Sequence, residues 1–136
     1  MNLVIDASMA LAWIFERQRP ERATRLLAAC GEQPWWVPAL WHLEISNALL
    51  VAERRGVIEA SACDLFLGRL QALPFHCDQE QAQDRRSKIV ALGRSHGLSS
   101  YDASYLELAH RLGASLASFD RKLNKAAESL ELSLLF

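Results

Sequence analysis

Short apolar runs alternate with longer segments of helical periodicity along the chain. Residues 2–6 are apolar and rich in branched side chains before an acid, which predicts a buried strand followed by a turn. Other predicted strands lie at residues 36–37, 75–77, 115–118 and, last, 132–134. Predicted helices lie at residues 8–15, 20–29, 39–55, 59–72, 78–96, 99–112 and 120–130. Ser8, Asp78 and Ser99 are expected to cap three of them.

This alternation favours one fold class. Strands that alternate with helices, without any Asn-Gly or Asp-Gly hairpin pair, indicate βα units and a parallel sheet. We therefore expect an α/β fold, a three-layer α/β/α sandwich around a short, mostly parallel central sheet. No repeat or linker divides the chain, so residues 1–136 are expected to form a single domain.

The composition is typical of a globular protein without a membrane span. The chain is 51% hydrophobic and 23% charged, as in a globular domain, and its longest apolar run, residues 9–15, is far short of the roughly 20 residues of a membrane span. An acid at position 6 with no basic residue before it argues against a signal peptide. Cys30, Cys63 and Cys77 are odd in number and widely spaced, which favours reduced thiols and a cytoplasmic protein without membrane contact.

The net charge excludes strong nonspecific attraction to nucleic acid. Fifteen Lys and Arg against sixteen Asp and Glu give a formal net charge of -1. A polyanion would therefore have to use local basic clusters, such as those at residues 17–25, 85–88 and 121–125. The alternative is that these clusters are solvated helix faces.

Several acids fall where predicted strands end or helices begin. In parallel sheets, ligands bind outside the carboxyl ends of the strands. Asp6 ends the first strand, Asp102 follows Ser99 by three residues, and Asp120 follows the strand at residues 115–118. Each of the three could instead serve only as a turn or helix cap.

A fourth acid, Glu44, lies inside the helix at residues 39–55. Glu44 and Asn47 interrupt an apolar stripe, formed by Leu40, Leu43, Ala48 and Val51, that predicts the buried face. A carboxylate on a buried face needs a cation or a proton, because desolvation disfavours its charge. The alternative is a rotated stripe that brings Glu44 to solvent.

The four acids together point to a metal ion. Carboxylates gathered at one sheet edge repel one another and cannot all ionise at neutral pH without positive charge between them. No Lys or Arg is adjacent to Asp6, Glu44 or Asp102 in the sequence. An all-oxygen set of ligands suits Mg²⁺ or Mn²⁺ rather than zinc, and such sites act on phosphates.

Four segments in order along the chain resemble a known family. They are VIDAS at residues 4–8, LEISNAL at 43–49, SYDASYLELA at 100–109 and LASFDRKL at 116–123. With them the chain resembles PIN-domain proteins of the small toxin kind called VapC. The resemblance implies that Asp6, Glu44, Asp102 and Asp120 bind metal and act in catalysis, with Ser8, Asn47 and Ser118 in support.

The resemblance also implies a fold and an activity. The fold would be a Rossmann-like parallel sheet of about five strands. The activity would be Mg²⁺- or Mn²⁺-dependent endonucleolytic cleavage of RNA by a metal-activated water, leaving a 5′-phosphate and a 3′-hydroxyl. Arg17, Arg121 and Lys122 are the candidates for holding the substrate phosphate. Proteins of this kind pair with a small antitoxin and form homodimers, so both partners are expected.

Two other functions fit the same acids. One is a metal-dependent phosphatase or nucleotide hydrolase that cleaves small phosphate esters. The other is a catalytically silent PIN-like domain that only binds a partner. Four tryptophans in the first third of the chain fit core packing first, then a partner or dimer surface, and base stacking last; they are Trp13, Trp35, Trp36 and Trp41.

Overall fold

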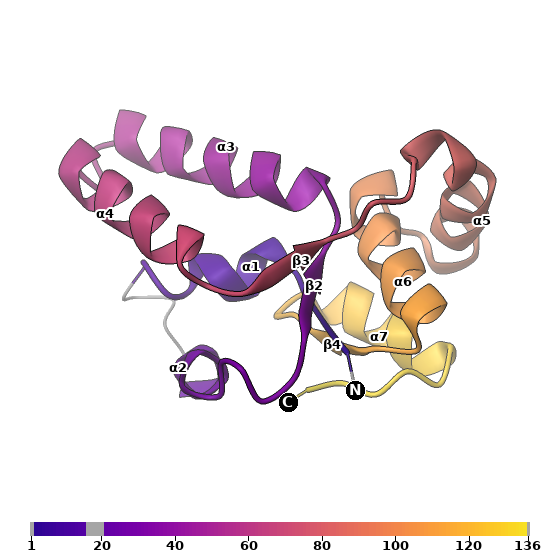
Figure 1. The fold of residues 1–136 in the computed structure, drawn as a ribbon. Coiled ribbons are helices and arrows are strands. Elements are labelled where there is room, and N and C mark those ends of the chain that lie inside the picture. Colours follow the sequence, from indigo (N-terminus) through magenta and orange to yellow (C-terminus); the bar gives the residue numbers. More distant parts are fainter. Residues whose placement is uncertain (1, 16–20, 136) are drawn as a thin grey trace.

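The computed structural model describes residues 2–15 and 21–135, and its centre is a four-stranded parallel sheet (Figure 1). The strands are β1 (Leu3–Ile5), β2 (Trp35–Val37), β3 (Phe75–Cys77) and β4 (Ser115–Ala117), in the order β3-β2-β1-β4. The helices are α1 (Ala7–Leu11), α2 (Glu21–Ala28), α3 (Leu40–Arg54), α4 (Ala60–Gln71), α5 (Arg86–His96), α6 (Ser100–Leu112) and α7 (Arg121–Ser129), with a 3₁₀ turn, η2 (Ala82–Asp84), before α5.

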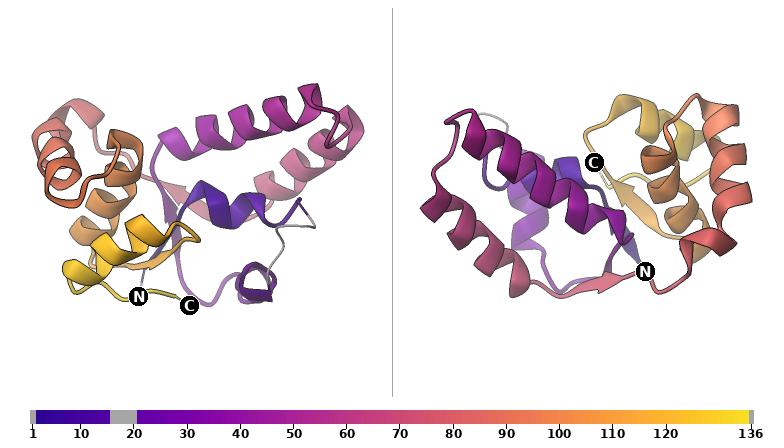
Figure 2. Two further views of the ribbon diagram at one scale, coloured as in Figure 1. Left: turned by 180° about the vertical axis from the view of Figure 1, so that it is seen from behind. Right: turned by 90° about the horizontal axis from the view of Figure 1, so that it is seen from above.

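Helices cover both faces of this sheet. The chain steps from β1 to β2 to β3 in one direction and then crosses back to β4 on the other side of β1. Because parallel crossovers are right-handed, the reversal changes the face on which the helices pack. Helices α1–α4 accordingly lie on one side and α5–α7 on the other (Figure 2). The predicted three-layer α/β/α sandwich is confirmed, and its topological switch point lies between β1 and β4.

The core is built on the central strands and a row of aromatic rings. Every side chain of β1 is fully buried, as its uninterrupted apolar run predicts. Trp35 of β2 stacks on Trp13, with ring centroids 6.0 Å apart, and Trp41 is also buried. Trp36 is half-buried and stacks on His76 at 5.0 Å. Core packing therefore accounts for three of the four tryptophans.

Two helix starts differ from the predictions. Asp78 does not cap a helix, because its carboxylate accepts a hydrogen bond of 2.6 Å from the Arg111 guanidinium, and α5 begins only after η2. The N-cap of α1 is Asp6 rather than Ser8, since the Asp6 carboxylate accepts from the backbone N–H of Met9.

The carboxyl-terminal segment forms less sheet than predicted. In place of a strand at residues 132–134, Leu134 makes an isolated parallel bridge with Leu116. The backbone N–H of Leu116 donates to Ser133, and that of Leu135 donates to Leu116. The described part of the chain thus has four strands rather than about five.

Two observations bear on the environment of the chain. Among the described residues, no helix is both long enough and apolar enough to pass through a membrane. Cys30, Cys63 and Cys77 are free thiols, and each is half-buried. No disulfide between them therefore contributes to the stability of the fold.

Candidate active site

Asp6 lies at the switch point, where β1 ends, and its carboxylate is fixed from both sides. The side chain is 5% exposed. Ser8 donates to Oδ1 at 2.5 Å, Ser118 donates to Oδ2, and the backbone N–H of Met9 donates to Oδ1 at 3.2 Å. Burial raises the pKa of Asp6 above its usual value, although the hydrogen bonds from the two hydroxyls oppose the shift.

The same two hydroxyls connect Asp6 to the loop that carries Asp120. The backbone N–H of Asp120 donates to the Ser118 hydroxyl at 2.9 Å, and that of Phe119 donates to the Ser8 hydroxyl at 3.3 Å. Each hydroxyl therefore accepts from the loop after β4 and donates to Asp6. This arrangement sets the position of the loop relative to the end of β1.

Asp120 and Asp102 each lie at the start of a helix. Asp120 is the N-cap of α7, and its Oδ1 accepts from the backbone N–H of Leu123 at 2.9 Å. Asp102 is in the first turn of α6, whose N-cap is Ser99 as predicted. Burial and then the charge of Asp120 raise the pKa of Asp102, while Ser99 and Lys122 lower it. The two carboxylates are therefore within electrostatic range of each other.

The orientation of α3 differs from the predicted one. Its buried residues are Trp41, Ile45, Leu49 and Ala52, whereas Leu43, which was predicted to be buried, is 75% exposed. Glu44 lies at the margin of this stripe and is half-buried. Asn47 is exposed, and it is not the group that bonds to Glu44. The alternative of a rotated stripe is thus correct, with Glu44 between core and solvent.

Glu44 interacts with two of the other acids. Burial raises its pKa most, and the charges of Asp6 and Asp102 raise it further. The Tyr105 hydroxyl opposes this shift by donating to Glu44 Oε1 at 2.5 Å. The four predicted acids therefore form a continuous series of electrostatic interactions, from Asp6 through Glu44 and Asp102 to Asp120.

Tyr105 is a site residue that the sequence reasoning missed. It lies on α6 three residues after Asp102, and its side chain is 1% exposed. The spacing of three residues on one helix face, together with the need of a buried phenol for a hydrogen-bond partner, could have identified it. Apolar periodicity alone treats Tyr105 as an ordinary core residue.

The predicted cations have different positions. Lys122, in the first turn of α7, is exposed and acts electrostatically on Asp102. Arg121 is exposed beside it, at the first position of α7. Arg17 lies outside the described residues. Of the predicted phosphate ligands that the structure describes, Lys122 is thus the one whose charge reaches an acid of the site.

The donor set fits a hard divalent cation in its chemistry. All candidate ligands are oxygens. Burial raises the pKa values of Asp6, Glu44 and Asp102, and neighbouring carboxylates raise those of Glu44 and Asp102 further. Within residues 2–15 and 21–135, however, no three Asp, Glu, His or Cys side chains are grouped so that they could hold a metal ion. The carboxylates therefore interact electrostatically but do not form a coordination sphere.

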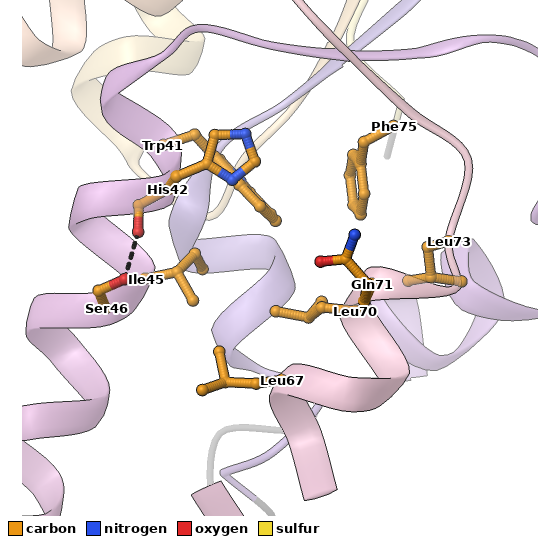
Figure 3. A pocket seen from close by; sticks show the side chains of 9 residues that line it. All are labelled: Trp41, His42, Ile45, Ser46, Leu67, Leu70, Gln71, Leu73 and Phe75. Atoms are coloured by element: carbon orange, nitrogen blue, oxygen red, sulfur yellow. Dashed lines mark hydrogen bonds between the residues drawn. The ribbon is translucent and has the colours of Figure 1, made fainter. Parts of the chain in front are cut away.

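Two cavities lie away from these acids. One, of about 490 Å³, is a groove between α3 and α4 with a mixed lining that includes Trp41, Leu67 and Leu70 as well as His42 and Gln71 (Figure 3). The second, of about 400 Å³, is lined by Trp36, Arg111 and the acids around Asp78. Neither is lined by any of the four predicted metal ligands.

The burial of Glu44, together with the charges of Asp6 and Asp102, predicts the effect of Glu44→Gln on stability. The raised pKa means that the folded chain holds the Glu44 proton more tightly than the unfolded chain does, so ionisation above pH 4.5 costs stability. Glu44→Gln is therefore expected to be at least as stable as the parent at pH 7 in the presence of chelator. This advantage should shrink as the pH falls through the raised pKa towards 4.5.

Urea unfolding of both chains between pH 7 and pH 4 measures this difference. The introduced glutamine keeps an oxygen that can accept from Tyr105, so the comparison isolates the charge. The electrostatic interpretation would be contradicted if the free energy of unfolding of Glu44→Gln fell further below that of the parent as the pH rises to 7.

The fold and the acidic series at its switch point define a class, the small α/β proteins of the PIN type. The PIN domain family matches residues 3–129, and the chain belongs to this family. Its similarity extends to Ribonuclease VapC3 from Pyrobaculum aerophilum, which is 32% identical over 127 residues that cover 90% of this chain and 92% of that protein. The expected resemblance to VapC-like PIN proteins is confirmed.

Solved structures show the same fold. PAE2754 from Pyrobaculum aerophilum superposes with a TM-score of 0.71 at 22% identity, covering 93% of this chain and 84% of that one. FitAcB from Neisseria gonorrhoeae superposes with a TM-score of 0.63 at 14% identity, covering 97% and 95%. FitAB bound to a DNA fragment gives a TM-score of 0.56 at 15% identity, covering 97% and 92%.

Proposed function

We propose that the chain is a metal-dependent endoribonuclease, a single nuclease domain over residues 1–136 and the toxin of a toxin-antitoxin pair. The observation that carries the proposal is the electrostatic series of Asp6, Glu44, Asp102 and Asp120 at the sheet's switch point. Membership of the PIN domain family and the similarity to a protein named Ribonuclease VapC3 support it.

The four acids would hold Mg²⁺ or Mn²⁺. Bound there, such an ion supplies an activated water and Lewis-acid stabilisation of the phosphodiester transition state. Asp6 presents a carboxylate whose rotation is prevented by Ser8 and Ser118. Fixed ligands reduce the reorganisation needed when substrate binds, which is how ligand orientation contributes to rate.

Lys122 would position the RNA backbone. It is exposed at the start of α7, and its charge reaches Asp102. A lysine acts on phosphate as a point charge, so it would draw a phosphodiester to the edge of the acidic site without fixing base identity. Arg121, the adjacent residue, could extend this contact along the strand.

The proposed partners follow from the VapC resemblance. A cognate antitoxin protein would bind the chain in the cytoplasm, and the active form would be a homodimer. The similarity to a protein named Ribonuclease VapC3 supports RNA as the substrate.

Metal-dependent cleavage of a fluorogenic single-stranded RNA tests the activity. The purified chain is expected to cleave it with Mg²⁺ or Mn²⁺ and to be inactive with chelator. Release of p-nitrophenol from p-nitrophenyl phosphate, without RNA cleavage, would support the phosphatase instead. Inactivity on both substrates by a folded, partner-free chain would support the silent binding domain.

Ser118→Ala tests the positioning of Asp6. The change removes the donor to Asp6 Oδ2 and the acceptor for the Asp120 backbone N–H. Cleavage should fall about tenfold, and the free energy of unfolding by about 1–2 kcal/mol. Ser46→Ala is the matched control, because the Ser46 hydroxyl donates to the His42 carbonyl within α3. Equal cleavage rates for the two variants would contradict the role of Ser118.

A further inference from the structure

The hydroxyl of Tyr105 joins three structural elements that carry acids of the site. Tyr105 donates to Glu44 Oε1 at 2.5 Å, across 61 positions of sequence. The backbone N–H of Ala7, the residue after Asp6, donates to the same hydroxyl oxygen. Tyr105 itself lies on α6, one turn after Asp102. One phenol group therefore contacts α3 and the start of α1 while it belongs to α6.

The hydrogen bonds of this phenol have a defined direction. The hydroxyl is protonated at neutral pH, as a phenol ordinarily is, and it donates to Glu44 Oε1. It therefore acts as a donor to Glu44 and as an acceptor from Ala7. Tyr105 contacts Oε1 of Glu44, so the second oxygen, Oε2, could bind a cation while this bond is kept.

We infer that Tyr105 is a positioning residue for metal binding. Its hydrogen bond fixes the position of the Glu44 carboxylate relative to those of Asp6 and Asp102. This inference rests on the proposed function, since it concerns the same acids. A buried phenol needs an acceptor for its proton, and a neutral carbonyl would satisfy that need. The Tyr105 hydroxyl instead donates at 2.5 Å to a carboxylate of the acidic series, 61 positions away in the sequence.

Tyr105→Phe tests the inference, because it keeps the buried ring and removes only the hydroxyl. Its affinity for Mn²⁺, measured by the free-ion electron paramagnetic resonance signal, should be about tenfold weaker than that of the parent. The control is Tyr101→Phe, which removes the 65%-exposed phenol of the chain's other tyrosine and should leave the affinity unchanged. In a Glu44→Gln background, Tyr105→Phe should have no further effect, because its target is already lost.

The outcomes separate this inference from the proposed function. A parent chain that does not bind Mn²⁺ would overturn the proposed function, and with it this inference. A parent that binds Mn²⁺ and a Tyr105→Phe variant with the same affinity, even with a lower melting temperature, would overturn the inference alone. The inference would also be overturned if adding Tyr105→Phe to Glu44→Gln weakened Mn²⁺ binding further. Tyr105 would then not act through Glu44.

A second measurement applies if Tyr105→Phe does not fold. The chain has two tyrosines, so 3-fluorotyrosine gives two fluorine resonances, which Tyr101→Phe assigns. The Tyr105 resonance of the parent should shift on titration with diamagnetic Mg²⁺, and Glu44→Gln should abolish the shift. A Tyr105 resonance that does not respond to Mg²⁺, in a parent chain that binds Mn²⁺, would overturn the inference.

Discussion

Asp6→Asn is expected to reduce RNA cleavage by at least about a hundredfold, more than the loss of a residue that only orients a metal ligand. The substitution keeps the size of the side chain and removes its charge. It also places an amide NH₂ against Ser8 or Ser118, both of which now donate to this carboxylate. The fold should survive, because burial already disfavours the charged form of Asp6.

The matched control for this change is Asp64→Asn. Asp64 is an exposed acid on α4, outside the acidic series, so its loss should leave cleavage unchanged. Circular dichroism and melting temperature establish that both variants are folded. Cleavage by Asp6→Asn at the parent's rate would exclude Asp6 as a metal ligand.

Trp35→Ala is expected to have the largest effect on stability, a loss of about 3–5 kcal/mol in the free energy of unfolding. Trp35 is 1% exposed in β2, next to the centre of the sheet. Its ring stacks on Trp13 at 6.0 Å and packs at 5.5 Å against Phe75 of β3. Removing it opens a cavity bounded by rigid strands, which cannot collapse to fill the space.

Trp36→Ala provides the comparison for Trp35→Ala. Trp36 follows directly in β2, on the other face of the strand, and is half-buried. Its ring stacks on His76, and its indole N–H donates to Asn2 at 3.2 Å. Its replacement should cost about half as much or less, as measured by urea unfolding. Equal losses for the two variants would contradict the assignment of the core.

The fold was largely predictable because its three layers follow from the alternation of strands and helices along the chain. They do not depend on individual side-chain contacts. Buried parallel strands read as short apolar runs, and residues 3–5 and 115–117 have this pattern. The errors fell where a tertiary contact overrides a local preference. Asp78 has the character of a helix cap, but Arg111 on α6 takes its carboxylate. Nothing near Asp78 in the sequence indicates that partner.

The acids of the candidate site could be identified from the sequence, but the residues that hydrogen-bond to them and fix their positions could not all be identified. Acids at strand ends stand out against apolar neighbours, which is why Asp6 and Asp120 were identified. The face of α3 was misassigned because the helix is apolar on several sides, and Leu43 is exposed although its spacing fits a buried stripe. Tyr105 was missed because its bond to Glu44 joins residues 61 positions apart.

The measurement that tests the central proposal most directly is the mapping of new RNA 5′ ends. Total cellular RNA is incubated with the purified chain or with Asp6→Asn, each with Mg²⁺, with Mn²⁺ or with chelator. The proposal predicts discrete new 5′-phosphate ends that need metal and are absent with Asp6→Asn. Ends that form equally with chelator or with Asp6→Asn, or no new ends under any metal with a folded chain, would contradict it.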